Sequence, residues 1–477
     1  MSTAASEIGW NGPPVAILWD QALVWGLICI DTLERLGIAH HLLSGRDVAE
    51  GALGSYRVLL VPGGWATHKV RALGELGRQR LEAFITGGGG YLGFCGGAGM
   101  ALSPSPSLGI VPLERMALSD RLPNASGHVV VRGIPGHPAW AGLPETLPIS
   151  IWWPSQFAWH PLPHSFPLAT YLSPGEDFTI ADLSYSDLKQ LDVPWNEWEC
   201  AYGINLNPVR LMGQPAMMEI RRGKGKLILS YPHLETPGDA MGNRLLANIL
   251  AHLSDSGSPW MPAGRPHPVP PGLSNDRPSA QALSRLRASL EMVEELIHFG
   301  ERNLLWSWRN PWLLQWRRGL RGLEYSMLAV VMRRVFEEAR SCAVPGDGEG
   351  DGSWLETSRR LERDTRDFCR MAARLLIEEK VAIQGGQLSK LGSVNPTVDR
   401  LRRELFGEKM SHSGLCGALF DRLDRMLLDL LRHSRIAAGD NRFESGHGNR
   451  RPRNPSPPFY LPERPESMRS ARSSESR

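Results

Sequence analysis

The chain has 477 residues, enough for two or three domains that each bury a core. Its formal net charge of +3 is too small to predict binding to nucleic acids or to membrane surfaces. Its six cysteines form no Cys-x-x-Cys pair and no His/Cys cluster, which argues against a disulfide framework and a structural zinc site and is typical of a reducing compartment.

The N-terminus lacks the basic segment and apolar stretch of a secretory signal, and we find no run of about 18 apolar residues. We therefore expect a cytoplasmic protein with no transmembrane segment. We also expect no cofactor. The spacing Gly88-x-Gly90-x-x-Gly93 has the form of a dinucleotide fingerprint, but these glycines precede a strand instead of following one.

Apolar, strand-like runs alternate with amphipathic stretches near the N-terminus. The pattern predicts strands at residues 15–19, 39–43, 58–61 and 91–94, and helices at residues 23–36 and 71–84. Such alternation predicts a parallel sheet with helices on both faces, in which ligands bind at the carboxyl ends of the strands. Asp20 and Trp65 follow two of these strands and are candidate pocket residues. For Asp20, a turn or helix cap is the alternative.

A cysteine lies where the last of these strands turns into a helix. The pattern Gly93-x-Cys95-x-Gly97 is the cysteine form of the nucleophile elbow, in which small residues allow a strained turn to expose the side chain above a sheet. The N-terminus of the helix that follows favours a thiolate over a thiol. We predict that Cys95 is a nucleophile; the alternative is a free cysteine packed as a small hydrophobe.

Two other strand ends carry groups that could act together with Cys95 in catalysis. A later apolar strand ends in His233-Leu-Glu235, which would supply a general base and a carboxylate that orients it, although residues at strand ends are often only solvated. The strand at 58–61 ends in Pro-Gly-Gly, so the backbone N–H groups of Gly63 and Gly64 are candidates for an oxyanion hole, or else an ordinary turn. The N–H of Gly96, after the cysteine, would be a further donor.

Over residues 58–102 and 223–235 the chain resembles class I glutamine amidotransferase-like domains. Within that superfamily it is most similar to the domain found at the N-terminus of eukaryotic biotin–protein ligases. The motifs that carry the resemblance are Pro-Gly-Gly, the stretch from Leu73 to Gly77, and the segment Gly-Gly-Tyr-Leu-Gly-Phe-Cys-Gly-Gly-Ala. The resemblance implies a flavodoxin-like fold.

The resemblance also implies roles for individual residues. Cys95, His233 and Glu235 occupy the positions of the family's catalytic triad, and Gly63 and Gly64 those of its oxyanion loop. The chain departs from the family pattern after the cysteine and between the histidine and the glutamate. The stretch between the elbow and the histidine also matches poorly, so the identity of the substrate does not transfer. No biotinyl-adenylate loop follows residue 255, so biotin ligation does not transfer either.

The rest of the chain divides by composition. An insertion rich in Pro and Trp spans residues 105–212, and its His160 and His164 lack the spacing of metal ligands, so we predict no metal site. A hairpin and a closing helix complete a first domain over residues 1–254, and a linker over 255–279 follows.

Residues 280–437 have helical apolar spacing and predict an all-α bundle of four or more helices. Within it, residues 306–321 combine tryptophans and arginines, either as a surface for a membrane or partner or as packing side chains of a helix. The last residues, 438–477, are rich in Arg, Ser and Pro and predict a disordered basic tail.

These features favour an amidase- or glutaminase-like cysteine hydrolase or transferase acting on a small amide or related acyl substrate. The alternative is a non-catalytic small-molecule-binding or scaffold protein on the same fold. In either case the helical domain is expected to contact a protein partner, and no specific nucleic acid is expected. The sequence does not indicate an oligomeric state.

Overall fold

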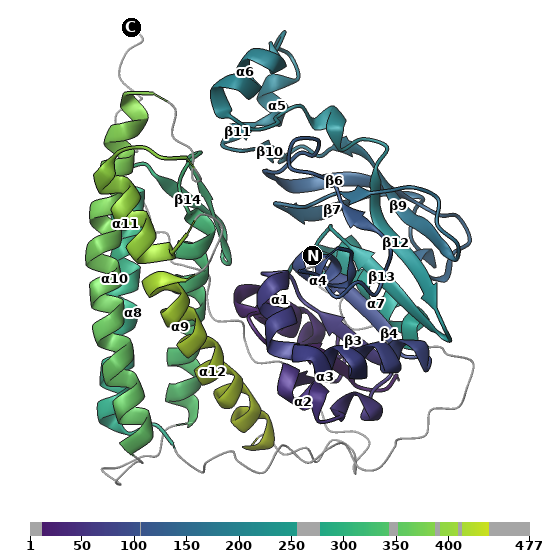
Figure 1. Cartoon of the computed structure of the whole chain (residues 1–477), viewed down its shortest axis with the longest axis horizontal. Coiled ribbons are helices and arrows are strands. Elements are labelled where there is room, and N and C mark those ends of the chain that lie inside the picture. Colours follow the sequence, from purple (N-terminus) through teal and green to yellow (C-terminus); the bar gives the residue numbers. More distant parts are fainter. Residues whose placement is uncertain are drawn as a thin grey trace, which may run out of the picture.

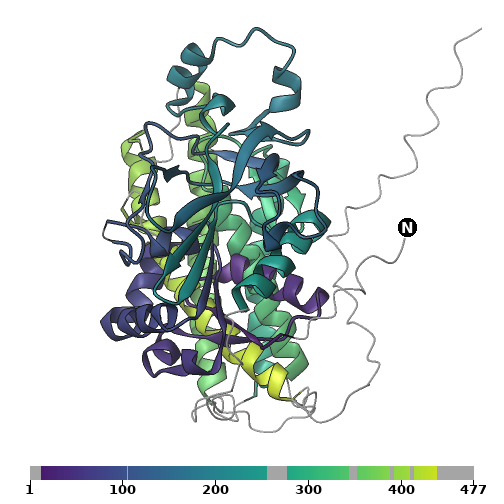
Figure 2. The same ribbon diagram turned by 90° about the vertical axis from the view of Figure 1, so that its right-hand side faces the viewer.

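The structure, a computed structural model, describes residues 12–104, 106–254, 277–342, 352–386, 392–408 and 413–437. Within these ranges a mixed α/β region is followed by a helical region, and the two lie side by side (Figures 1 and 2). The predicted tail, and the predicted linker up to residue 276, fall outside the described residues.

Eleven strands of the described chain form one mixed sheet. Its parallel half has the order β2 (His40–Leu43), β1 (Val15–Leu18), β3 (Val58–Val61), β4 (Gly90–Phe94) and β13 (Gly225–Ser230). The antiparallel half continues through β12 (Pro215–Arg222), β9 (Ser165–Pro174), β6 (Ala125–Gly133), β10 (Thr179–Ile180) and β11 (Leu183–Ser184), and β7 (Thr146–Trp152) pairs with β6.

The prediction of a parallel sheet is therefore correct for one half and wrong for the other. Residues 223 and 224 alone join β12 to β13, and a connection of two residues can only make an antiparallel hairpin. The Pro- and Trp-rich stretch, whose composition favours a β-layer with packed tryptophans over aromatic walls around a ligand, supplies most of the antiparallel strands.

Helices cover both faces of the parallel half. On one face α1 (Leu23–Arg35) and α7 (Ala240–Ser254) contribute to one apolar cluster. On the other, α2 (Gly45–Ala49), α3 (Ala66–Thr86) and α4 (Gly96–Ala101) contribute to a second. The shorter elements are η1 (Ala52–Ser55), β5 (Glu114–Arg115), η2 (Pro138–Trp140), β8 (Phe157–Ala158), α5 (Tyr185–Leu188), α6 (Trp195–Tyr202) and η3 (Pro208–Arg210).

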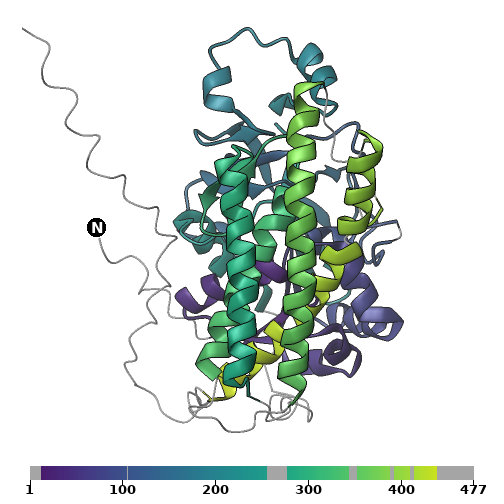
Figure 3. The same cartoon turned by 90° about the vertical axis from the view of Figure 1, so that its left-hand side faces the viewer.

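The helical region contains α8 (Ala280–Arg302), α9 (Gly322–Cys342), α10 (Gly352–Gln384), α11 (Pro396–Phe406) and α12 (Gly414–Ala437). The long helices α8 and α10 run side by side (Figure 3). Among the helices that the structure describes, none is both long enough and apolar enough to cross a bilayer.

The helical region is not all-α, because β14 (Trp306–Asn310) and β15 (Leu313–Trp316) form a hairpin between α8 and α9. Part of the hairpin contacts the α/β region, whereas Trp306 packs within the helical region, where its Nε1 donates to the carbonyl of Ile297. The rings of Trp316 and Trp153 lie 4.6 Å apart, and Arg309 donates hydrogen bonds to the hydroxyls of Ser126 and Thr179. Trp316 and Arg309 are therefore contacts between the two regions, whereas the ring of Trp306 lies 5.0 Å from that of Tyr325 on α9 and belongs to the packing of the helical region.

Candidate active site

The turn after β4 has the backbone of a nucleophile elbow. Cys95 has φ +46° and ψ −102°, a conformation that is strained for any residue other than glycine. Its N–H donates to the carbonyl of Ser230, at the end of β13, over 2.8 Å. Its side chain is partly exposed. The sheet thus holds the strained turn in place and leaves the thiol accessible.

The predicted oxyanion loop lies against this elbow. A Cβ atom on Gly96 would come within 1.8 Å of the carbonyl oxygen of Gly64, and one on Gly97 within 2.1 Å of the carbonyl oxygen of Val61. Gly64 has φ +100°, which L side chains rarely adopt. A Cβ on Gly63 would meet the His233 ring at 3.1 Å. Glycine is therefore required where the loop, the elbow and the histidine meet.

The predicted base and its orienting carboxylate form a buried pair. Nδ1 of His233 lies 2.7 Å from Oε1 of Glu235, and both side chains are fully buried. We therefore assign the proton to Nδ1, which donates it to the carboxylate. The ring of Trp25, on α1, stacks on the imidazole with 4.5 Å between centroids. The ring is held on one edge and across one face.

The other imidazole nitrogen faces the cysteine. Burial alone would lower the pKa of His233, but the Glu235 carboxylate and the Cys95 side chain outweigh burial and raise this pKa to about 10. Nε2 is buried and makes no hydrogen bond of ordinary geometry to any described residue, so the thiol lies close to it without a formed bond. The structure thus brings the three predicted triad residues together.

Side chains that the sequence did not single out hold the turn around His233. Thr236 donates from Oγ1 to the carbonyl of His233 over 2.8 Å, and Thr32 donates to the carbonyl of Glu235 over 2.7 Å. Asn243 donates to the carbonyl of Leu234 over 2.7 Å. Thr32 lies 203 residues away from its partner, so no local pattern could have indicated it.

The two predicted pocket residues have other contacts. The carboxylate of Asp20 accepts a hydrogen bond from the N–H of Gly45, the first residue of α2, and burial raises the pKa of this carboxyl. Asp20 therefore joins β1 to α2 and does not cap α1. The ring of Trp65 lies 6.2 Å from that of Phe420 on α12, so it contacts the helical region.

A buried lysine lies between the oxyanion loop and the helical region. Lys69 is completely buried, and its Nζ donates to the carbonyl of Asp20 over 3.0 Å. Burial lowers its pKa to about 8, although the negative charge of Asp424 on α12 acts to raise it. Asp424 in turn accepts from the N–H of Gln21 over 3.0 Å. Charged and polar groups thus attach α12 to the segment that follows β1.

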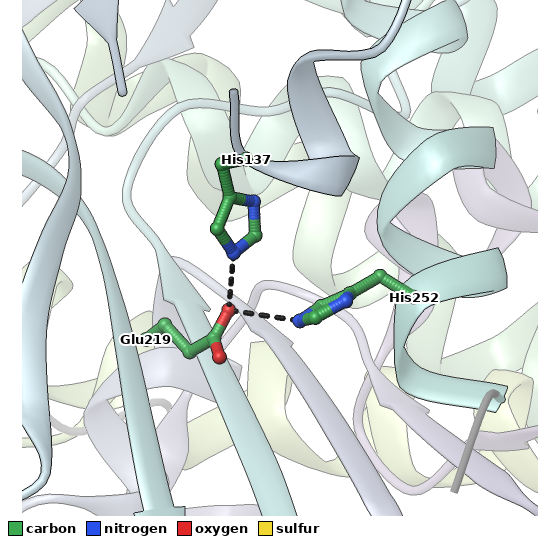
Figure 4. Close-up of side chains that lie close together, drawn as sticks. All are labelled: His137, Glu219 and His252. Atoms are coloured by element: carbon green, nitrogen blue, oxygen red, sulfur yellow. Dashed lines mark hydrogen bonds and ion pairs between the residues drawn. The ribbon is translucent and has the colours of Figure 1, made fainter. Parts of the chain in front are cut away.

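A second cluster has the donor set of a metal site. Nε2 of His137 and Nε2 of His252 each lie 3.0 Å from the same oxygen of Glu219, and the three ligand atoms lie within 4.8 Å of one another (Figure 4). Two histidines and one carboxylate are a common set for transition metals. The three residues are far apart in sequence, so their spacing could not indicate the cluster.

The hydrogen bonds of this cluster favour a structural role. Nδ1 of His137 accepts from the N–H of Ala139 over 3.1 Å, so the ring carries its proton on Nε2, which donates it to Glu219. A metal-bound nitrogen must be free of that proton, and metal-binding histidines usually donate from the other nitrogen. Burial would raise the pKa of Glu219, but the two histidines outweigh it and lower this pKa to about 2. The histidines therefore compensate a buried charge.

A third group has the residue types of a serine triad without its geometry. Oγ of Ser150 lies 3.5 Å from Nε2 of His128, whose Nδ1 lies 3.1 Å from Asp177. The hydroxyl donates instead to Asp239 over 2.9 Å, and Ser150 is only 1% exposed. Its proton is directed away from the histidine, and a substrate could not reach it. Cys95 remains the candidate nucleophile.

No protein-family model matches the chain, and no curated protein matches it. Its fold is similar to solved structures that cover about half of it. A glutamine amidotransferase from Thermotoga maritima is 11% identical over 52% of this chain and 100% of that one, with a TM-score of 0.34. PurLQS from the same organism is 12% identical over 51% and 99%, with a TM-score of 0.36. A glutamine amidotransferase from Methylobacillus flagellatus is 14% identical over 54% and 99%, with a TM-score of 0.28. Because these TM-scores are below 0.5, we base the assignment of the site on its own geometry.

Proposed function

We propose that the α/β region is a cysteine-dependent amide hydrolase or amidotransferase whose catalytic residues are Cys95, His233 and Glu235. The observation that carries the proposal is the buried imidazole of His233, which has the Glu235 carboxylate at one nitrogen and the Cys95 side chain near the other. The strained elbow supports it, because backbone strain of this kind occurs chiefly where function requires it.

In the proposed reaction, the sulfur of Cys95 attacks the amide carbon and His233 transfers a proton to the leaving nitrogen. The C–N bond breaks, ammonia or an amine leaves, and the acyl group remains on sulfur as a thioester. Water then hydrolyses the thioester with His233 as base, which gives a carboxylic acid and the free thiol. The N–H of Gly96 would stabilise the oxyanion, since it opens α4 and the first N–H groups of a helix have no acceptor within it. The N–H of Gly64, in the loop against the elbow, would be the second donor.

The electrostatics suit this role. Because the pKa of His233 is raised to about 10, the imidazole holds its proton at neutral pH and can stabilise a thiolate beside it. The Glu235 carboxylate keeps the imidazole in the orientation that directs Nε2 to the cysteine.

The test is ammonia release from a panel of primary amides that begins with L-glutamine, with peptide mass spectrometry of Cys95 to trap an acyl-enzyme. We expect release by the parent protein and none above background by Cys95→Ala. Cys200→Ala, which changes an exposed cysteine outside the site, is the matched control and should retain activity. Binding of an amide without release of ammonia and without an acyl-enzyme would favour the alternative of a non-catalytic binding protein.

A further inference from the structure

The chain between β1 and α1, together with the first residue of α1, has a strained backbone. Gln21 and Leu23 have φ values of +53° and +50°, in the left-handed region that side chains other than glycine rarely adopt. Strain of this kind persists only where the surrounding structure holds it, and it occurs chiefly at functional sites. Neither residue belongs to the proposed triad, so the strain requires a separate explanation.

The strained segment lies against the proposed oxyanion loop. A Cβ atom on Gly64 would come within 2.9 Å of the carbonyl oxygen of Gln21 and within 3.6 Å of the ring of Trp25. A Cβ on Gly63 would lie 3.1 Å from the same ring, which also stacks on His233. The backbone of Gln21 and the indole of Trp25 therefore limit the space that the two loop glycines can occupy.

A helix of the helical region holds this segment. Oδ2 of Asp424, on α12, accepts from the N–H of Gln21 over 3.0 Å, and the carbonyl of Asp424 accepts from Nε1 of Trp19 over 3.2 Å. Asp421, one turn earlier on α12, accepts from Nε2 of Gln21 over 2.6 Å. Gln21 is thus bound through its backbone and through its side chain to the same helix.

Asp424 also acts on the other side of the loop. Nζ of Lys69, on α3, donates to the carbonyl of Asp20 over 3.0 Å, and Cε of Lys69 would lie 3.9 Å from a Cβ on Gly64. The negative charge of Asp424 acts on this buried side chain. Asp424 is itself only 7% exposed, so water competes little for its carboxylate. It therefore interacts with both parts of the chain that border Gly64.

We propose that Asp424, supported by Asp421, is a positioning residue for catalysis: it holds the strained segment at Gln21 against Gly64 and so keeps the oxyanion loop in place beside Cys95. The inference deepens the proposed function, on which it rests. Asp424 does not touch the reacting atoms and acts through Gln21. The helical region is then required for the geometry of the site, because a side chain of α12 determines where the loop lies.

The test compares two reactions of the same sulfur. In acetylation by 4-nitrophenyl acetate, the sulfur of Cys95 bonds to the acyl carbon through a tetrahedral oxyanion and 4-nitrophenolate leaves. In alkylation by iodoacetamide, the sulfur displaces iodide and no oxyanion forms. The ratio of the acetylation rate to the alkylation rate therefore measures the effect of the oxyanion loop and cancels the reactivity of the thiolate.

Peptide mass spectrometry gives this ratio at Cys95 and, as an internal reference, at the exposed Cys200. In the parent protein the ratio at Cys95 should exceed that at Cys200 by at least about tenfold, since one oxyanion donor contributes about 100-fold or more. A parent ratio no higher than that at Cys200 would count against the oxyanion hole, and so against the proposed function and this inference together.

Asp424→Ala should lower the ratio at Cys95 by about tenfold, because a displaced loop no longer directs its N–H groups at the oxyanion. Asp424→Asn loses the charge but keeps an acceptor for the N–H of Gln21, so it should restore most of the ratio. Trp316→Ala removes a contact between the two regions that runs through Trp153 instead of Gln21, and it should leave the ratio unchanged. Circular dichroism checks that each variant is folded at the temperature of the assay.

A ratio that is high in the parent protein and equal in Asp424→Ala would overturn the role of Asp424 and leave the proposed function standing. An equal loss in Trp316→Ala would overturn it as well, because any loosening between the regions would then be sufficient. A ratio as low in Asp424→Asn as in Asp424→Ala would overturn the hydrogen bond to Gln21 as the means of positioning.

A milder variant keeps the test decisive if Asp424→Ala does not fold. Asp421→Ala removes only the exposed hydrogen bond to Nε2 of Gln21, so it should fold normally. The ratio at Cys95 should fall by about threefold, in keeping with the loss of one ordinary hydrogen bond. A ratio equal to that of the parent protein would then contradict the proposal.

Discussion

At the scale of single residues, the site depends on positions where only one residue type fits. The carbonyl of Gly64 occupies the space that a Cβ on Gly96 would need, and Gly63 faces the His233 ring. Cys95 itself has a backbone conformation that is strained for its type. The local spacing of glycines therefore predicted the elbow correctly, since the requirement for glycine is itself local.

Glu235→Gln tests the origin of the raised pKa of His233. The carboxylate is the largest contribution that raises this pKa, so its removal should lower the pKa markedly from about 10, because burial is then opposed only by the Cys95 side chain. The imidazole would then be neutral at pH 8, and we expect amide hydrolysis at that pH to fall by at least about 100-fold. Titration of the His233 ring by NMR checks the cause: a ring still protonated at pH 8 in the variant would contradict it.

The raised pKa of His233 also makes the stability of the protein depend on pH. A group whose pKa is raised in the folded state stabilises the protein fully below its unfolded pKa, and this contribution is lost as the pH rises through the folded value. For His233 the loss falls between pH 6.5 and about 10. In Glu235→Gln the free energy of unfolding should therefore vary less over this range, as urea titrations at several pH values would show.

At the scale of elements, the parallel strands determine which candidate site residues lie at the same edge of the sheet. β1, β3, β4 and β13 are parallel, so Asp20, the glycine loop, Cys95 and His233 all follow strand ends at one edge of the sheet. The alternation of strands and helices was sufficient to predict this edge. The antiparallel half could not be predicted in the same way, because strands such as β6 and β9 have irregular apolar patterns and their pairing is set by tertiary contacts.

The helix α12 provides a test of buried charge at this edge. Lys69 and Asp424 are both buried, and each charge partly compensates the cost of burying the other. Lys69→Met and Asp424→Asn should each lower the free energy of unfolding by about 3 kcal/mol, because each leaves the other charge uncompensated. In the double variant, the free energy of unfolding should fall by clearly less than the sum of the two single decreases. Urea unfolding of all four proteins measures the coupling, and strict additivity would contradict an interaction.

At the scale of the whole molecule, one apolar cluster extends from the α/β region into the helical region. It includes residues of α1 and α7 together with residues of α8, α9, α10 and α12. Compositional boundaries predicted separate domains joined by a linker, but they could not predict this shared core. The contacts that form it, such as Trp153 with Trp316, join residues far apart in the chain. For the same reason the sequence did not indicate Trp25 or Thr32.

A shared core predicts that the two regions unfold together. Core amides of α1 and α10 should exchange hydrogen with the same limiting free energy, equal to that of global unfolding. Trp316→Ala, which removes an inter-region contact, should lower both values equally by about 2 kcal/mol. Leu191→Ala, at an exposed position, should change neither value. A drop confined to α10 would show that the regions are independent.

The most direct test of the central claim is the rate of Cys95 alkylation by iodoacetamide at pH 7, measured by peptide mass spectrometry in the parent protein and in His233→Ala. If His233 activates the cysteine, the parent protein should react at least about tenfold faster than the variant, while alkylation of the exposed Cys200 stays the same in both. Equal rates at Cys95 in the two proteins would contradict the assignment of Cys95 and His233 as nucleophile and base.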